Sequence, residues 1–249
     1  MTDQETSQKN NKLSWSRIIP LLMLIVAIGL AFYFRLDRYL SFDNLKQHRH
    51  ALLAWTNQHY IVTVLSFMAL YIVAVALSLP GAVFLTLTSG FLFGIILGTI
   101  YTVVSATLGS TAVFIVVRFS LGEWLEQKAY SWAKKMQKGF QNNAFQYLLF
   151  LRLVPLFPFW VVNIVPAVFN VRLPIFMLTT FLGIMPGSFV YVLLGNGLGH
   201  IFDKGQTPNL GIILEPQILA PLVGLGILAL IPTIYKQIRR YYYGSKQSS

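Results

Sequence analysis

The chain has 249 residues, of which 55% are hydrophobic and only 11% are charged. Soluble domains carry about a quarter charged residues, so this composition excludes an ordinary soluble protein and indicates an integral membrane protein. The net charge of +11 does not indicate nucleic-acid binding, because the basic residues flank apolar segments, where they set topology and meet anionic headgroups. The chain has no cysteine, which excludes disulfides, thiol catalysis and cysteine metal sites.

The N-terminal part is predicted to contain a tail, an anchor and an interfacial helix. Residues 1–17 are polar and lack a periodic apolar face, which predicts a disordered tail. Residues 18–59 hold the other two elements. The apolar run Ile18 to Phe34 lacks the small residues of a signal-peptide cleavage site and is interpreted as an uncleaved anchor. Phe42 to Tyr60 mixes charged residues with leucines and Trp55, which predicts a helix lying along the membrane surface.

The next 58 residues, Tyr60 to Val117, contain no Asp, Glu, Lys, Arg or His. Because about 20 apolar residues cross a membrane once, several membrane elements must follow one another here. Pro80 and Gly81 are predicted to end a first helix at Leu79. Pro80 to Leu97 is too short to cross twice, and irregular backbone at membrane depth must be covered by protein or water. We therefore predict a re-entrant hairpin.

Gly90, Gly94 and Gly98 recur at a spacing of four within and just after this hairpin. Small residues at this spacing allow helices to pack closely. They could equally belong to a transport pathway, and the sequence leaves both interpretations open.

The pattern is repeated in the second half of the chain. Arg118 to Phe140 predicts a second amphipathic interfacial helix. Tyr147 to Val171 is an apolar stretch interrupted by prolines, and Leu173 to Leu194 is a further spanning helix. An offset of about 77 residues aligns Leu108–Gly122 with Met185–Gly199. One hairpin plus one crossing makes an odd number of crossings, so the second copy would enter from the opposite side, as in inverted-repeat transporters.

Five crossings are predicted in total, near residues 18–34, 60–79, 98–117, 173–194 and 216–235. With these crossings, 14 of the 19 Lys and Arg residues lie on the side of the C-terminal tail and four on the other side. The positive-inside rule places the basic side in the cytoplasm. The prediction is an all-α, multi-pass protein of the cell (inner) membrane, with a core at 60–199, a loop and last crossing at 200–235, and a basic cytoplasmic tail at 236–249.

The remaining cation, Arg152, lies in the apolar stretch YLLFLRLVPLFPFW. An arginine at the bilayer centre costs about 2.5 to 3.5 kcal/mol or more, and no carboxylate lies within the apolar segments to compensate it. The remaining partners are backbone carbonyls freed at Pro155 and Pro158, water, or an anionic ligand such as a lipid phosphate. Alternatively, Arg152 only pins the hairpin or reaches the interface. Asn163 either donates to the ligand or satisfies the hairpin backbone.

Two stretches carry a family resemblance, SLPGAVFLTLTSGFLFGIILGT and FLRLVPLFPFWVVNIVPAVFNVRLPIFMLTTFLGIMPG. With them, the region from Tyr60 to Gly199 resembles the DedA or SNARE-associated Golgi protein superfamily, also called the VTT-domain proteins. The resemblance implies two re-entrant hairpins flanked by helices. It also implies a role in lipid scrambling, in recycling of polyprenyl-phosphate carrier lipids, or in membrane homeostasis.

The resemblance also implies site residues. Arg152 and the prolines after it match the family's hairpin motif, and the proline-glycine pair matches the turn of the first hairpin. The candidate hairpin-breaking residues are Pro80, Gly81, Gly90, Pro155, Pro158 and Pro166. Bacterial relatives thought to be proton-coupled have an acidic residue directly after the proline-glycine pair. Ala82 occupies that position here, which argues against proton coupling.

Transfer of lipids between leaflets is the function favoured by these features, either as a phospholipid scramblase or as a translocase of polyprenyl phosphate or another anionic lipid. The expected partners are membrane lipids with anionic headgroups, and an oligomer is compatible with the sequence. No catalytic residue, metal or cofactor is expected, because the histidines lie outside the apolar spans and no hydrolase, acyltransferase or phosphate-loop motif occurs. The alternatives are a secondary transporter of a small anion or solute, and an assembly factor that uses Lys134, Lys135 and Lys138 to hold partners or anionic lipid.

Overall fold

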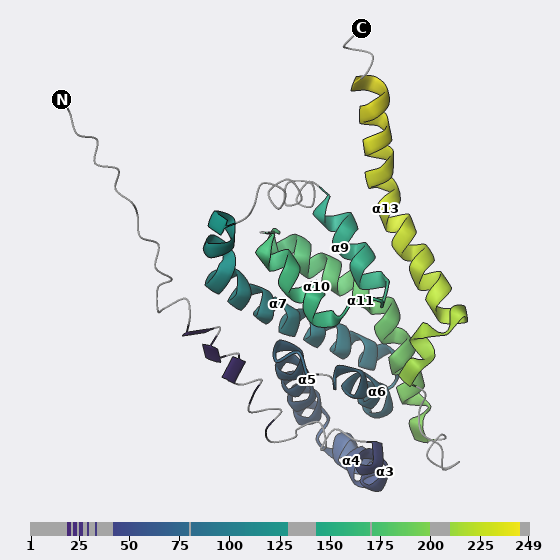
Figure 1. The fold of residues 1–249 in the computed structure, drawn as a ribbon. Helices are drawn as coiled ribbons and strands as arrows, with labels where there is room; N and C mark the ends of the chain where they lie inside the picture. The colour runs from purple at the N-terminus through teal and green to yellow at the C-terminus, as the bar shows by residue number, and fades with distance from the viewer. Residues whose placement is uncertain are drawn as a thin grey trace, which may run out of the picture.

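The structure of the protein, a computed structural model, describes residues 42–79, 81–128, 143–169, 171–199 and 210–244, together with scattered positions between 19 and 33. Within these ranges every regular element is helical (Figure 1). The elements are α3 (Phe42–Gln47), α4 (Arg49–Gln58), α5 (Tyr60–Ala76), α6 (Ala82–Phe93), α7 (Ile95–Lys128), α9 (Ala144–Leu153), α10 (Phe159–Val168), α11 (Leu173–Asn196), η1 (Leu210–Leu214) and α13 (Pro216–Gly244). The helical part of the predicted all-α fold is thereby confirmed.

Two of the described helices are long and apolar enough to cross a membrane on their own. They are the Ile95–Ser120 part of α7 and the whole of α11, with 26 and 24 residues. A third crossing results if α4 and α5, which are bent by 116° at His59, count as one broken span. The predicted crossings near 60–79 and 216–235 correspond to α5, which has 17 residues, and to α13, whose apolar part is Pro216–Ile231. Both are shorter than the usual span of about 20 residues.

Several helices begin or end beside glycine and proline residues, which interrupt helical backbone. The chain turns between α6 and α7 at Gly94, whose φ of 75° and ψ of −173° suit glycine alone. Helix α9 ends at Leu153, and Val154 before Pro155 is extended, as expected for a residue that precedes proline. Pro158 is the N-cap of α10. The proline-interrupted stretch is therefore two short helices joined by residues 154–158.

Helices α6 and α11 cross in direct backbone contact. A Cβ atom built on Gly90 would lie 2.0 Å from the carbonyl oxygen of Val192, and one built on Gly195 would lie 2.0 Å from that of Leu87. Gly90 was predicted to break the first hairpin, but it lies inside α6, and the chain turns at Gly94 instead. The close contact with α11 explains the glycine at this position, because small residues allow membrane helices to approach closely where they cross.

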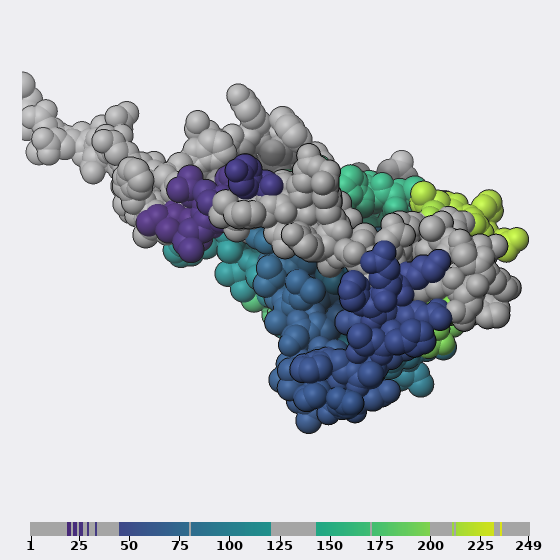
Figure 2. All heavy atoms as spheres, turned by 90° about the horizontal axis from the view of Figure 1, so that it is seen from below, coloured from purple at the N-terminus to yellow at the C-terminus, as the bar shows by residue number. Residues whose placement is uncertain are grey.

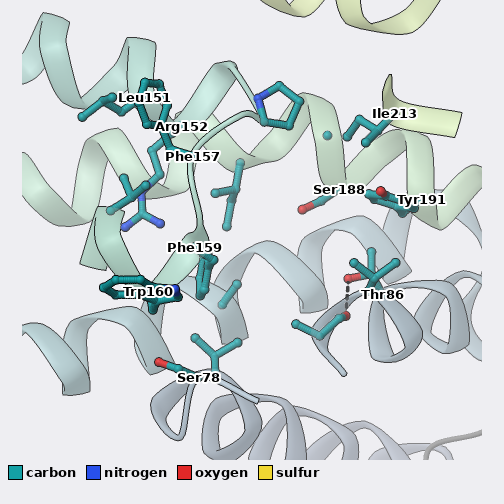
Figure 3. A pocket seen from close by; sticks show the side chains of 18 of the residues that line it. Ser78, Thr86, Leu151, Arg152, Phe157, Phe159, Trp160, Ser188, Tyr191 and Ile213 are labelled. Carbon is teal, nitrogen blue, oxygen red and sulfur yellow. Dashed lines mark hydrogen bonds between the residues drawn. The ribbon is translucent and has the colours of Figure 1, made fainter. Parts of the chain in front are cut away.

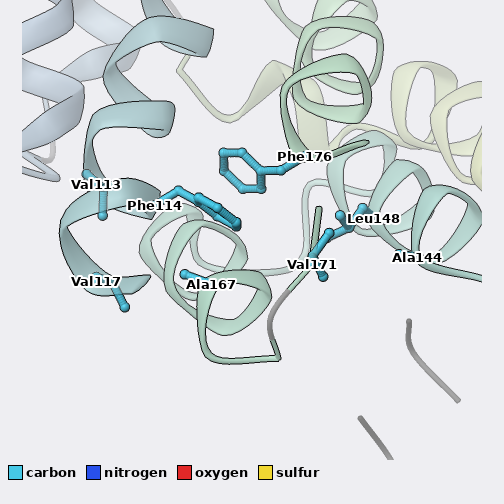
Figure 4. Close-up of a cluster of buried hydrophobic side chains, with 8 residues drawn as sticks. All are labelled: Val113, Phe114, Val117, Ala144, Leu148, Ala167, Val171 and Phe176. Carbon is cyan, nitrogen blue, oxygen red and sulfur yellow. The ribbon is translucent and has the colours of Figure 1, made fainter. Parts of the chain in front are cut away.

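The cluster of buried side chains in Figure 4 joins α7, α9, α10 and α11. Phe114 of α7 and Phe176 of α11 are fully buried and stack with their ring centroids 4.4 Å apart. Leu148 of α9 and Ala167 of α10 complete the contact from the other two helices, and neither is accessible to solvent. This cluster fixes the hairpin of α9 and α10 against the two long helices.

The outer face of the helices is apolar. Ile61 and Leu65 of α5 and Ile96 of α7 are 73%, 62% and 75% exposed. Figure 2 shows the residues of α4 and α5, in blue, on the surface seen from below. Large apolar side chains on the outside, combined with buried hydroxyl groups and a buried arginine inside, are the arrangement that a bilayer solvent favours.

The two predicted interfacial helices have different outcomes. The segment of the first is helical as α3 and α4, and α4 is bent by 116° against α5. The second was predicted to begin at Arg118, but α7 continues through that residue to Lys128, because no proline interrupts it. Residues 129–142, with Lys134, Lys135 and Lys138, lie outside the described residues. Pro80, most of the predicted anchor and the N-terminal tail lie outside them too.

Arg118 ties α7 to the connection between α10 and α11. Its Nη1 donates a hydrogen bond of 2.9 Å to the carbonyl oxygen of Val171, and its Cζ lies 5.9 Å from the Phe114 ring centroid. We expect Arg118→Met to reduce stability by about 1 to 2 kcal/mol, because the Val171 carbonyl loses its charged donor. Thermal unfolding of the purified protein in detergent checks this, and an unchanged melting temperature would contradict the assigned bond.

Candidate lipid-binding cavity

A cavity of about 490 Å³ lies among α5, α6, α7, α9, α10, α11 and η1 (Figure 3). Pockets for small molecules have volumes of about 300 to 1,000 Å³. One charged side chain, Arg152, lines the cavity, together with apolar and aromatic residues and several hydroxyl groups. Trp160 and Phe157 are 55% and 44% exposed, so the aromatic part of the lining also reaches the outer surface. The cavity thus combines an apolar wall with a single cation.

Arg152 is held by polar side chains of two other helices. It is the penultimate residue of α9 and is only 8% exposed. Its Nη2 donates to Asn163 Oδ1 of α10 at 2.7 Å and to Thr180 Oγ1 of α11 at 2.9 Å. The Thr180 hydroxyl in turn donates to the Phe176 carbonyl at 2.7 Å, so its oxygen is oriented to accept from the arginine. One guanidinium therefore connects three helices.

Two aromatic rings and a glycine complete the environment of Arg152. Its Cζ lies 5.3 Å from the ring centroids of Phe159 and Phe176, within the range of cation–π interaction. A Cβ atom built on Gly183 would collide with Cβ of Arg152, so the glycine allows α9 to approach α11 at this point. The side chain is consequently fixed in orientation by packing as well as by hydrogen bonds.

Two buried donors of this group have no hydrogen-bond partner within the described part of the chain. They are Nη1 of Arg152 and Nδ2 of Asn163. A buried donor without a partner costs about 1 to 3 kcal/mol, and more when it is charged. An anionic ligand in the cavity that accepts from Nη1 would remove this cost for Arg152.

The predicted site residues are only partly brought together. Arg152 and Pro155 line the cavity, whereas Asn163 is fully buried behind Arg152 and is absent from the lining. Pro158 begins α10, Gly81 precedes α6, and Pro166 lies inside α10 without ending it. The predicted backbone carbonyls are not the partners of Nη2. Side-chain oxygens take their place, because α10 and α11 present Asn163 and Thr180 to it.

Helix α11 contributes residues to the site that the sequence patterns did not single out. Thr180, Phe176 and Gly183 all contact Arg152 or its hydrogen-bond partners, yet none was proposed for the site. A signal was present, because the pair Thr179-Thr180 is polar within the otherwise apolar stretch from Leu173 to Pro186. A polar pair at membrane depth indicates a partner inside the protein.

Residues 79–197 match the sequence profile of the VTT domain. The chain therefore contains a VTT domain. The VTT domain runs from the end of α5 to the end of α11, so it contains Arg152, Asn163 and Thr180 and most of the cavity wall. Together with the apolar helices, the VTT domain supports a multi-pass membrane protein related to the DedA superfamily.

The VTT-domain chain is also similar to proteins named Transmembrane protein 41B. It is 28% identical to the human protein over 199 residues, which cover 78% of this chain and 66% of the human one. The mouse protein is 27% identical over 205 residues, covering 80% and 68%. The Transmembrane protein 41 homolog of Dictyostelium discoideum is 29% identical over 203 residues, covering 79% and 58%. The chain thus spans about two thirds or less of these relatives, and no solved structure matches it.

Proposed function

We propose that the protein moves lipids between the two leaflets of its membrane, with the lipid phosphate passing Arg152. The observation that carries the proposal is the unpartnered, buried Nη1 of Arg152 beside a cavity that has no acidic residue in its described lining. A guanidinium is permanently charged and matches phosphate oxygens in geometry. The apolar, partly exposed rim at Phe157 and Trp160 would let acyl chains remain in the bilayer.

The order and packing of the helices support a transporter-like repeat. Helix α6 begins at Ala82 and α10 at Phe159, 77 residues later, while α7 begins at Ile95 and α11 at Leu173, 78 residues later. Each short helix packs on the long helix of the other unit, α6 on α11 and α10 on α7. With 12 and 10 residues, α6 and α10 are too short to cross alone. We propose that they are the re-entrant elements of an inverted repeat.

The basic residues support an orientation for the proposed activity. The residues from Arg118 to Lys138 and the C-terminal tail together carry nine of the 19 Lys and Arg residues, which favours the cytoplasmic side of a cell membrane for both. Anionic headgroups in that leaflet would attract these segments. Membrane lipids are therefore the proposed partners as well as the proposed substrates.

Lipid transfer by the wild-type protein is tested in proteoliposomes. The vesicles contain a phospholipid with a fluorophore on one acyl chain. Dithionite added outside destroys only the fluorophores in the outer leaflet. We expect loss of nearly all fluorescence in vesicles that contain protein and about half in empty vesicles. Equal loss in both would contradict lipid transfer. Uptake of a small anion or solute that depends on an imposed proton or sodium gradient would favour the secondary transporter instead.

The hydroxyl group of Thr180 should contribute to lipid transfer, whereas that of Thr179 should not. Both hydroxyl groups are buried and donate to backbone carbonyls, those of Ile175 and Phe176 for Thr179 and that of Phe176 for Thr180. Only Thr180 also accepts from Arg152. We expect Thr180→Val to slow lipid transfer about tenfold, because a hydrogen bond to a charged group is worth about 1.5 to 3 kcal/mol. Thr179→Val is the matched control, and equal effects of the two would contradict the assigned role.

A further inference from the structure

The cavity has a second polar side that is formed by hydroxyl groups. Thr86 and Tyr71 belong to it but bond each other at 2.9 Å, and Thr86 also donates to the Ala82 carbonyl at 2.8 Å. Ser78 and Ser188 line the cavity as well. Their hydroxyl groups have no hydrogen-bond partner among the described residues. These two serines are therefore the hydroxyl groups of the lining that are open to a ligand.

Ser78 has an unusual backbone conformation. It is the only non-glycine residue with positive φ in the described ranges, at 52°. It follows α5 in a Schellman turn, in which Leu79 N–H donates to the Ala74 carbonyl and Ser78 N–H donates to the Val75 carbonyl, each at 2.9 Å. Glycine is the usual residue at this position, because other residues are strained in the left-handed region.

Within the described residues, the strained conformation of Ser78 allows no hydrogen bond that a glycine could not also make. Both bonds of the Schellman turn are made by backbone N–H groups, so glycine could make them equally well. The hydroxyl group is the hydrogen-bonding feature that a glycine would lack, and it belongs to a residue of the cavity lining. A strained residue beside a cavity is typical of a functional contact.

We infer that Ser78 forms a second subsite, which binds an uncharged oxygen of the lipid whose phosphate meets Arg152. This inference rests on the proposed function. Figure 3 shows the two residues on separate parts of the cavity wall, and they come from the end of α5 and from α9. Since Arg152 is the one charged residue of the described lining, the second group should be neutral. A headgroup hydroxyl, as in phosphatidylglycerol, and an ester carbonyl, as in any diacyl glycerophospholipid, both qualify. A bare polyprenyl phosphate carries neither.

Ser78→Gly tests the subsite, because stability and transfer should change in opposite directions. Relief of the left-handed strain should raise the melting temperature by about 2 °C. Loss of the hydroxyl should slow transfer of glycerophospholipids about fivefold, as expected for one neutral hydrogen bond. Ser78→Ala is the matched control, since it loses the hydroxyl but keeps the strain. It should slow transfer without the gain in stability.

Three tail-labelled lipids identify the bound oxygen: diacyl phosphatidylglycerol, diacyl phosphatidic acid and dialkyl phosphatidylglycerol. A lower ratio of phosphatidylglycerol to phosphatidic acid transfer in Ser78→Gly would assign the headgroup hydroxyl. A lower ratio of diacyl to dialkyl transfer would assign the ester carbonyl. Unchanged ratios, or a less stable Ser78→Gly protein, would overturn the subsite while leaving the proposed function intact. A wild-type protein that transfers none of the three lipids contradicts the proposed function itself.

Discussion

Arg152→Met should slow the transfer of phosphate-bearing lipids about 10- to 100-fold. The hydrogen bond between a charged donor and its acceptor is worth about 1.5 to 3 kcal/mol, and about 1.4 kcal/mol corresponds to a factor of ten. Methionine has a similar length and removes a charge that is costly at membrane depth, so the variant should still fold. Transfer rates in proteoliposomes, divided by the amount of folded protein, measure the effect.

Arg118→Met is the matched control for this experiment. It makes the same chemical change in an arginine that bonds the Val171 carbonyl and does not line the cavity. We expect it to lower stability while leaving transfer per folded molecule unchanged. A labelled ceramide, which has no phosphate, adds a second control, because its transfer should not depend on Arg152. Equal losses for Arg118→Met and Arg152→Met, or for ceramide and phospholipid, would contradict a phosphate contact.

Gly90→Ala and Gly195→Ala should each destabilise the fold by about 3 kcal/mol. At both positions the new Cβ atom would lie 2.0 Å from a backbone carbonyl oxygen of the facing helix, so α6 and α11 would have to separate. Overpacking against backbone has no flexible side chain to relieve it. The monodisperse fraction after size-exclusion chromatography in detergent and the melting temperature measure the loss.

Gly224→Ala in α13 is the control for the two glycine variants. A Cβ atom built there has no neighbour within 4 Å, so alanine should be tolerated and should favour the helix. If all three variants behaved alike, the close crossing of α6 and α11 would be wrong.

The membrane character and the helical breaks could be predicted from the sequence because they depend on local chemistry. A long uncharged run requires a bilayer, and Pro155 and Pro158 end and begin helices wherever the chain is placed. The choice between Gly90 and Gly94 as the turn could not be predicted. Both tolerate unusual backbone, and only the contact of Gly90 with α11 shows that it serves packing instead.

The hydrogen-bond partners of Arg152 depend on tertiary packing and could therefore not be predicted from the sequence. Asn163 and Thr180 are 11 and 28 residues away in sequence, on two other helices. Which face of α10 and α11 meets α9 is decided by the buried cluster around Phe176 and by Gly183. The sequence did identify the isolated cation and its need for compensation, since that follows from its charge in an apolar stretch alone.

The most direct test is an experimental structure of the protein in lipid nanodiscs that contain glycerophospholipid. We expect density for a lipid phosphate within hydrogen-bond distance of Nη1 of Arg152, at the depth of the hydrocarbon region, with Nη2 still bonded to Asn163 and Thr180. A structure with Arg152 among the headgroups, or with Nη1 bonded to protein and no lipid in the cavity, would contradict the proposed lipid route.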